Sequence, residues 1–245
     1  MCANGSIAAV KAAWSGSAML WLLPSQPRTF AAGVDSGLSG VELGSFLIKR
    51  VVGELKAEFP GIETFCTLSP IPRFRRWLQM NAAGVEAMLP QELADSTRQL
   101  LVDTSAHAAS KESAPLGQLL LDATMSTQWM SDPVLTKALQ APLMTLCARY
   151  LVAVRREGLA FDPVANFHLR NGACIYRINW LANTTERGNH ESCAMMVNYN
   201  YLQEYVESNN QAYLFNGRIA VHGANPLLAR VVADAQLGEE SVFIV

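Results

Sequence analysis

The feature that most constrains the fold is a helix that leads directly into a buried strand. In GSFLIKRVVGELKAEFP, residues 44–60, apolar side chains recur at helical spacing and charged ones lie on the other side. Pro60 and Gly61 end this helix. The segment IETFCTLS, residues 62–69, follows as a strand rich in Ile, Thr and Phe. This succession predicts an α/β (α+β) fold, in which a sheet is flanked by helices.

The composition supports a globular chain of this class. Its 245 residues fit one large domain or two small ones, and half of them are hydrophobic, so a sizeable core can form. A net charge of −2 and a pI near 6.1 argue against a nucleic-acid-binding surface. No apolar run reaches the roughly 18 to 20 residues that span a bilayer. We therefore expect neither nucleic acid nor a membrane as a partner.

Cysteines and histidines give no metal-binding pattern. The five cysteines are scattered and form no C-x-x-C pair, which predicts free thiols in a reducing compartment. The four histidines show no H-x-x-x-H spacing. The sequence therefore predicts no metal site.

Further elements follow along the chain. Residues 83–107, 115–124 and 132–158 are predicted as helical, the last bent by Pro142. Asn166–Trp180 is predicted as two strands joined at Asn171-Gly172, a strong short hairpin signal, which places His168 in a strand. Residues 193–213 are predicted as an apolar segment that runs into a helix, followed by a polar tail.

Ser69 stands at the end of the predicted strand and is followed by Pro70 and Pro72. A proline holds its own φ near −65° and biases the preceding residue toward extended geometry. This arrangement fixes the direction of the Ser69 side chain. A plain Ser-Pro turn without chemistry gives the same local sequence.

Two further features have chemical potential. Gly37, Gly40 and Gly44 lie just before the first helix, where exposed N–H groups and the helix dipole suit a phosphate, although a plain turn gives the same pattern. The imidazole of His168 can give and take a proton near neutrality, so Ser69 and His168 could form an acid–base or nucleophilic pair. No G-x-S-x-G motif is present, which argues against an ordinary serine hydrolase.

Three segments together resemble one family. GVELGSFLIKRVVGELKAEFP, TLSPIPRFRRWL and DPVANFHLRNGACIYRINWLANTTERGNHESCAMMVNYNY occur in the order seen in malonyl-CoA decarboxylases. The resemblance is to the C-terminal catalytic domain and runs from about Gly37 to about Tyr205. Where that family has Gly, in SPIPGF, this chain has Arg73.

The resemblance implies an acetyltransferase-like superfold with CoA lying across the sheet. Ser69 and His168 match the catalytic serine and histidine of the family, and Tyr201 matches a tyrosine of the same pocket. The turn that matches the CoA-pyrophosphate cradle consists of Ser39, Gly40, Val41, Glu42, Leu43, Gly44 and Ser45.

The reaction implied is decarboxylation of malonyl-CoA to acetyl-CoA and CO₂, in malonyl-CoA and fatty-acid metabolism. It needs no cofactor, because the thioester itself accepts the electrons of the broken bond. Two other hypotheses stay open at this point. One is a non-catalytic acyl-CoA-binding remnant, and the other is an N-acetyltransferase of the same superfold.

The resemblance also sets expectations for organisation and location. It divides the chain into a divergent segment, residues 1–36, and a catalytic domain, residues 37–245, whose sheet is expected to be incomplete at its N-terminal side. A homo-oligomer is possible. The ending ESVFIV is not a peroxisomal S-K-L-type signal, so we expect a cytoplasmic or mitochondrial protein.

Overall fold

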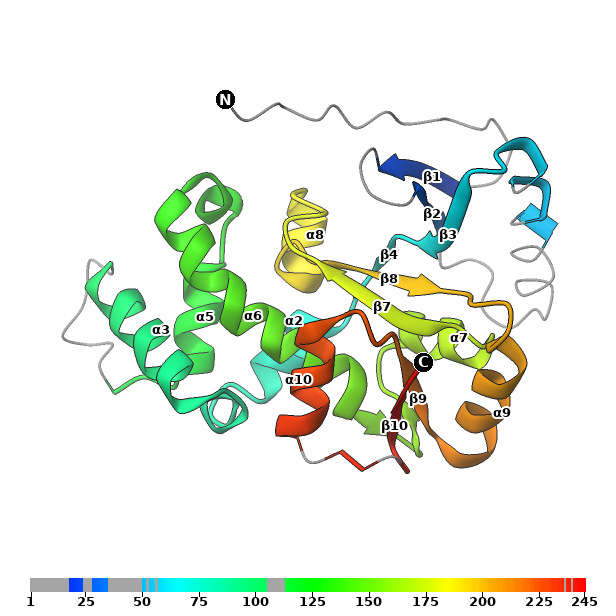
Figure 1. Cartoon of the computed structure of the whole chain (residues 1–245). Coiled ribbons are helices and arrows are strands. Elements are labelled where there is room, and N and C mark those ends of the chain that lie inside the picture. Colours follow the sequence, from blue (N-terminus) through cyan, green and yellow to red (C-terminus); the bar gives the residue numbers. More distant parts are fainter. Residues whose placement is uncertain are drawn as a thin grey trace.

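The fold is built on one mixed sheet with helices around it (Figure 1). The computed structural model describes residues 18–23, 28–34, 50–51, 53–55, 57–104, 113–235, 237–238 and 240–245. Eight strands form the sheet, in the order β1-β2-β3-β8-β7-β9-β10, with β4 paired to β8. The α/β class and the flanking helices predicted from the sequence are confirmed.

The sheet combines parallel and antiparallel pairs. The pairs β2–β3, β7–β9 and β9–β10 are parallel, and the other neighbours are antiparallel. The strands are β1 Ala18–Leu23, β2 Arg28–Val34, β3 Ile62–Thr67, β4 Ser69–Pro70, β7 Cys174–Asn179, β8 Met196–Asn200, β9 Ile219–Val221 and β10 Val242–Ile244. A separate two-stranded ribbon consists of β5 Arg155–Arg156 and β6 Leu159–Ala160.

The helices form two groups. In Figure 1, α3, α5 and α6 make a lobe to one side of the sheet, whereas α7 and α9 lie beside β7 and β8. Their bounds are α2 Phe74–Met80, α3 Gln91–Asp103, α5 Leu116–Ala123, α6 Pro133–Ala153, α7 Pro163–Arg170, α8 Glu186–Ser192, α9 Val206–Asn216 and α10 Pro226–Asp234. Short 3-10 helices occur at Val85–Met88 and Thr127–Ser131.

The start of the chain supplies two strands. β1 and β2 lie within the first 36 residues, and β2 pairs in parallel with β3. The described residues between 50 and 58 are helical, in agreement with the predicted helix. A strand, a helix and a parallel strand therefore follow one another here, as an α/β unit requires.

The predicted hairpin at Asn166–Trp180 is wrong, because its first half is the helix α7. Asp162 caps this helix by accepting the N–H groups of Val164 and Ala165, both at 3.0 Å, and Pro163 occupies its first position. Asp-Pro is a helix-start signal, and the same signal opens α6 at Asp132-Pro133. His168 therefore lies on a helix and not on a strand.

Asn171 and Gly172 end α7 instead of turning a hairpin. A two-residue type I′ hairpin needs a positive φ at both residues, but φ is −93° at Asn171 and +82° at Gly172. The N–H groups of Asn171 and Ala173 both donate to the carbonyl of His168. This left-handed glycine is the usual stop of a helix. It leads the chain from α7 directly into β7.

The predicted polar tail is also wrong, because two of the eight described strands of the sheet come from it. β9 and β10 add two parallel strands beside β7, and α10 between them packs on α6. Asn225 caps α10 ahead of Pro226, a third Asx-Pro helix start. The predicted helix at residues 132–158 ends earlier, at Ala153, because the chain turns into the β5–β6 ribbon.

We predict that Gly172→Ala lowers the free energy of unfolding by more than Gly158→Ala. Both glycines have nearly the same φ, +82° and +81°, so both variants suffer the left-handed strain of about 1–2 kcal/mol. An added Cβ at Gly172 would also lie 2.1 Å from the carbonyl oxygen of Val206, whereas Gly158 has nothing within 4 Å. Urea denaturation of the two variants measures the difference. Equal losses would show that α7 and α9 do not approach as described.

Candidate active site

Ser69 is held on the sheet beside β8. It pairs with Val197 and is followed by Pro70, which pairs with Met196. Pro70 fixes the backbone after Ser69 and starts the exit toward α2. The side chain of Ser69 is only 1% exposed. This short strand thus places the Ser69 hydroxyl in the interior of the protein.

His168 reaches the same place from α7. Ala165, His168 and Leu169 form the buried side of this helix, at the i, i+3, i+4 spacing of a single face. The Asp162 cap is itself buried, and Tyr150 donates its hydroxyl to the second carboxylate oxygen at 3.0 Å. The anchored helix start fixes the position of His168, which is 2% exposed.

Successive hydrogen bonds connect the three side chains of the implied active site in a line. The Oγ of Ser69 lies 3.0 Å from Nε2 of His168. The other ring nitrogen, Nδ1, lies 2.8 Å from the hydroxyl of Tyr201. Ser69 begins β4, His168 lies on α7 and Tyr201 directly follows β8, and the fold brings them together.

Thr67 extends this line, and no motif in the sequence marks it. Ser69 donates its hydroxyl to Oγ1 of Thr67 at 2.9 Å, and the backbone N–H of Tyr199 donates to the same oxygen at 3.2 Å. Thr67 ends β3 and Ser69 begins β4, and both strands pair with β8, so these residues two positions apart project to the same face. A threonine in a strand looks like an ordinary strand former, so only this spacing could have pointed to it.

Beside Thr67, the side chain of Asn198 takes the place of a backbone hydrogen-bond donor. Its side-chain amide donates to the carbonyl of Thr67, and Asn179 donates to its side-chain oxygen at 2.7 Å. Here a side-chain amide and a side-chain hydroxyl take part in the contact of β3 with β8. The Thr67 hydroxyl, which accepts the Tyr199 N–H, also contacts Ser69.

Aromatic rings cover His168 and determine its charge. The ring of Tyr199 stacks on the imidazole at 4.4 Å between centroids, and that of Phe167 meets it edge-on at 5.2 Å. Burial lowers the pKa of His168 from 6.5 to about 3, because the charged form is poorly solvated there. Burial also raises the pKa of the Tyr201 phenol. At neutral pH the line contains a neutral imidazole and a neutral phenol.

This arrangement can pass protons. A neutral imidazole donates from one nitrogen and accepts at the other, so it connects the two hydroxyls on either side of it. Tyr201 is partly exposed, whereas Ser69 and His168 are buried. The line thus runs from a residue near solvent to a hydroxyl in the interior.

Two further sequence features are the predicted CoA-binding turn and Arg73. The turn from Ser39 to Ser45 lies outside the described residues. The exposed Arg73 places its guanidinium 5.7 Å from the ring centroid of Phe161.

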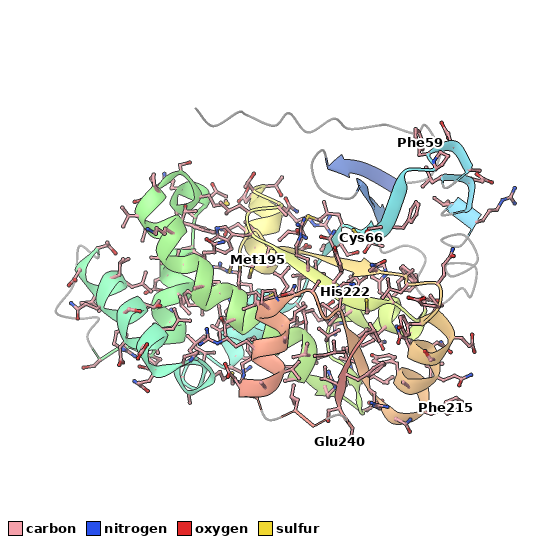
Figure 2. The ribbon with its side chains drawn as sticks, in the orientation of Figure 1. Phe59, Cys66, Met195, Phe215, His222 and Glu240 are labelled. Atoms are coloured by element: carbon pink, nitrogen blue, oxygen red, sulfur yellow. The ribbon has the colours of Figure 1, made fainter. Side chains whose placement is uncertain are left out.

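The sequence predicts free thiols and no metal site. Cys66, Cys147, Cys174 and Cys193 are buried free thiols, as predicted, and burial raises the pKa of Cys66 to about 12. Cys66 is the penultimate residue of β3, directly before Thr67, and pairs with Asn200 of β8 (Figure 2). Within the described ranges, no three His, Cys, Asp or Glu side chains converge to hold a metal ion. In the same ranges no helix combines the length and the apolar character needed to cross a membrane.

We predict that His168→Asn flattens the loss of stability in acid. The folded protein keeps His168 neutral down to about pH 3, whereas the unfolded chain binds a proton near 6.5. Stability from this burial is therefore present above 6.5 and is lost as the pH falls, by up to about 1.4 kcal/mol per pH unit.

Urea denaturation at several pH values between about 7 and 4 measures this slope. His190→Asn is the matched control, because that side chain is exposed to water in the folded protein as well. An unchanged slope in His168→Asn would contradict the burial of a neutral imidazole.

Comparison with known proteins identifies the family of this chain. Residues 30–236 match the family model described as the malonyl-CoA decarboxylase C-terminal domain. The mitochondrial malonyl-CoA decarboxylases of Mus musculus and Anser anser anser are each 44% identical over 182 residues, or 74% of this chain. The chain spans 36% and 35% of the length of these relatives.

Solved structures give the same family. Malonyl-CoA decarboxylase from Rhodopseudomonas palustris matches with a TM-score of 0.62 and 31% identity, over 83% of this chain and 42% of that one. The enzyme from Agrobacterium vitis matches with a TM-score of 0.63 and 27% identity, over 87% of this chain and 52% of that one. With its sequence matched over residues 30–236, the chain belongs to the malonyl-CoA decarboxylase family.

Proposed function

We propose that this chain decarboxylates malonyl-CoA to acetyl-CoA and CO₂. The observation that carries the proposal is the buried line of Ser69, His168 and Tyr201, with contacts of 3.0 and 2.8 Å. These are the residues that the family resemblance assigns to the catalytic pocket. The names of the relatives, malonyl-CoA decarboxylases, support malonyl-CoA as the substrate.

The chemistry requires a hydrogen-bond donor and a proton. When the bond between the α-carbon and the carboxylate breaks, CO₂ leaves and the electron pair delocalises into the thioester as an enolate. A donor already in place stabilises the developing negative charge on the thioester oxygen or the carboxylate. The α-carbon then takes up one proton and the product is acetyl-CoA.

Ser69 and His168 fit these two tasks. The Ser69 hydroxyl is fixed by Thr67 and His168, so it can donate to the carboxylate or the enolate without reorganising. His168 supplies the proton and Ser69 relays it. Tyr201, which is partly exposed, replaces the proton that the imidazole gives up.

The CoA portion is assigned to the turn before the first helix. We propose that Ser39, Gly40, Val41, Glu42, Leu43, Gly44 and Ser45 hold the pyrophosphate, since backbone N–H groups at a helix start bind anions. The thioester is the electron sink of the reaction, so the proposed chemistry calls for no cofactor. The names of the relatives support a mitochondrial location, with the cytoplasm as the alternative.

We predict that Ser69→Ala and His168→Asn each lower malonyl-CoA turnover by about 10² to 10³, the usual effect of losing a preorganised donor or a general acid. CoA affinity should stay nearly constant, because both residues act at the acyl end. Turnover and melting temperature are measured on the same preparation.

Ser192→Ala is the matched control. Ser192 is also buried, but its hydroxyl donates to the carbonyls of Gly188 and Met195, so this variant should lose stability and keep its specific activity. A Ser69→Ala protein as active as wild type would refute the assigned role. A wild-type chain that binds CoA without turnover would support the acyl-CoA-binding remnant instead.

We predict that Gly44→Val weakens CoA binding, because a branched side chain crowds the backbone that must approach the pyrophosphate. Calorimetric titration with CoA measures the dissociation constant. Unchanged affinity in a folded variant would remove this turn from the binding site.

A further inference from the structure

We propose that Thr67 is a positioning residue that fixes the tautomer of His168, with the proton on Nε2 facing Ser69. The inference deepens the proposed function and rests on it for its catalytic meaning. Its structural basis is the chain of four hydrogen-bonding groups Tyr201, His168, Ser69 and Thr67. All four contacts that define it lie between 2.8 and 3.2 Å.

The same atoms allow two directions of hydrogen bonding. In the first, Tyr201 donates to Nδ1, Nε2 donates to Ser69, and Ser69 donates to Thr67. In the second, every bond is reversed and the ring carries its proton on Nδ1. A neutral imidazole has one N–H and one bare nitrogen, so the two directions exclude each other.

The structure favours the first direction at both ends. At one end, the phenol of Tyr201 is the most acidic hydroxyl of the line, and a bare imidazole nitrogen is its strongest acceptor. At the other end, the Thr67 oxygen accepts from both Ser69 and the backbone N–H of Tyr199. The backbone N–H of Tyr199 occupies one lone pair of this oxygen, and the second lone pair is free to accept the Ser69 hydroxyl in the orientation of the 2.9 Å contact.

The tautomer decides what Ser69 can do. With a proton on Nε2, Ser69 can pass its own proton to the α-carbon while the Nε2 proton moves onto Oγ and the Tyr201 proton onto Nδ1. The imidazole stays neutral throughout, and solvent restores the phenol and, after product release, the starting tautomer. With a bare Nε2, the ring would instead take the proton from Ser69, as in enzymes that use serine as a nucleophile. Thr67 thus directs the pair toward proton delivery.

The test reads the tautomer directly. We expect two-bond ¹H–¹⁵N correlation spectra of the ¹⁵N-histidine-labelled chain to show His168 protonated on Nε2, with its signals assigned by their loss in His168→Asn. In Thr67→Val, Ser69 loses the acceptor for its proton and turns to the ring, so His168 should shift to the Nδ1-protonated form. Thr67→Ser keeps the hydroxyl and should keep the wild-type tautomer.

Thr97→Val is the matched control. Thr97 is buried as well, but its hydroxyl donates to the carbonyl of Leu93 within α3, so its loss should not alter His168. Turnover of malonyl-CoA should fall about tenfold to 100-fold in Thr67→Val, with little change in KM, and should be largely restored in Thr67→Ser.

The spectra also separate this inference from the proposed reaction, because they need no turnover. An Nδ1-protonated ring in the wild-type chain overturns the assignment, even if the Thr67→Val protein does not fold. An Nε2-protonated ring that persists in Thr67→Val overturns the role of Thr67. The expected spectra from a chain without turnover would leave the tautomer assignment intact and refute only the reaction.

Discussion

The hydrogen bond between Ser69 and His168 joins two parts of the chain that are 99 positions apart. Three features of the neighbouring elements hold this contact at 3.0 Å. Pro70 fixes the strand end, the buried Asp162 anchors the start of α7, and Gly172 turns the chain from α7 into β7. Because the two residues sit on rigid elements and not on long loops, their geometry is set by the packing of α7 on the sheet.

Burial gives this contact its chemical character. The rings of Tyr199 and Phe167 remove water from around the imidazole, and the resulting desolvation keeps it neutral. A neutral ring between two hydroxyls can pass protons while the imidazole itself stays uncharged. The cost is a histidine that opposes folding in acid, since the unfolded chain can protonate it. The site therefore ties acid sensitivity to its function.

The sequence predicted the fold class better than the local elements. The helix and strand at residues 44–69 were enough for an α/β sheet, and the Ser-Pro-Ile-Pro motif marked Ser69. The Asn171-Gly172 pair was misinterpreted, since an Asn-Gly dipeptide also ends a helix when only the glycine has a positive φ. The Asp162-Pro163 pair was the overlooked signal, and together with this glycine it would have predicted α7.

Other features depended on tertiary structure. The role of Thr67 arises from its contact with β8, where Tyr199 donates a backbone N–H to a side chain, and no local pattern in the sequence encodes that contact. The strands β9 and β10 are three residues each, too short for a period-2 pattern to be distinguished. Such short strands are stabilised by their neighbours in the sheet and so cannot be inferred from their own residues.

We propose that this line of side chains delivers a proton to the carbon left by departing CO₂. The most direct test of this proposal is to incubate the wild-type chain with malonyl-CoA in deuterated water and to follow CO₂ and the acetyl methyl group at early times. The account predicts acetyl-CoA that carries one deuterium in its methyl group, formed in equal amount to CO₂. A folded chain that binds CoA and releases neither product would contradict it.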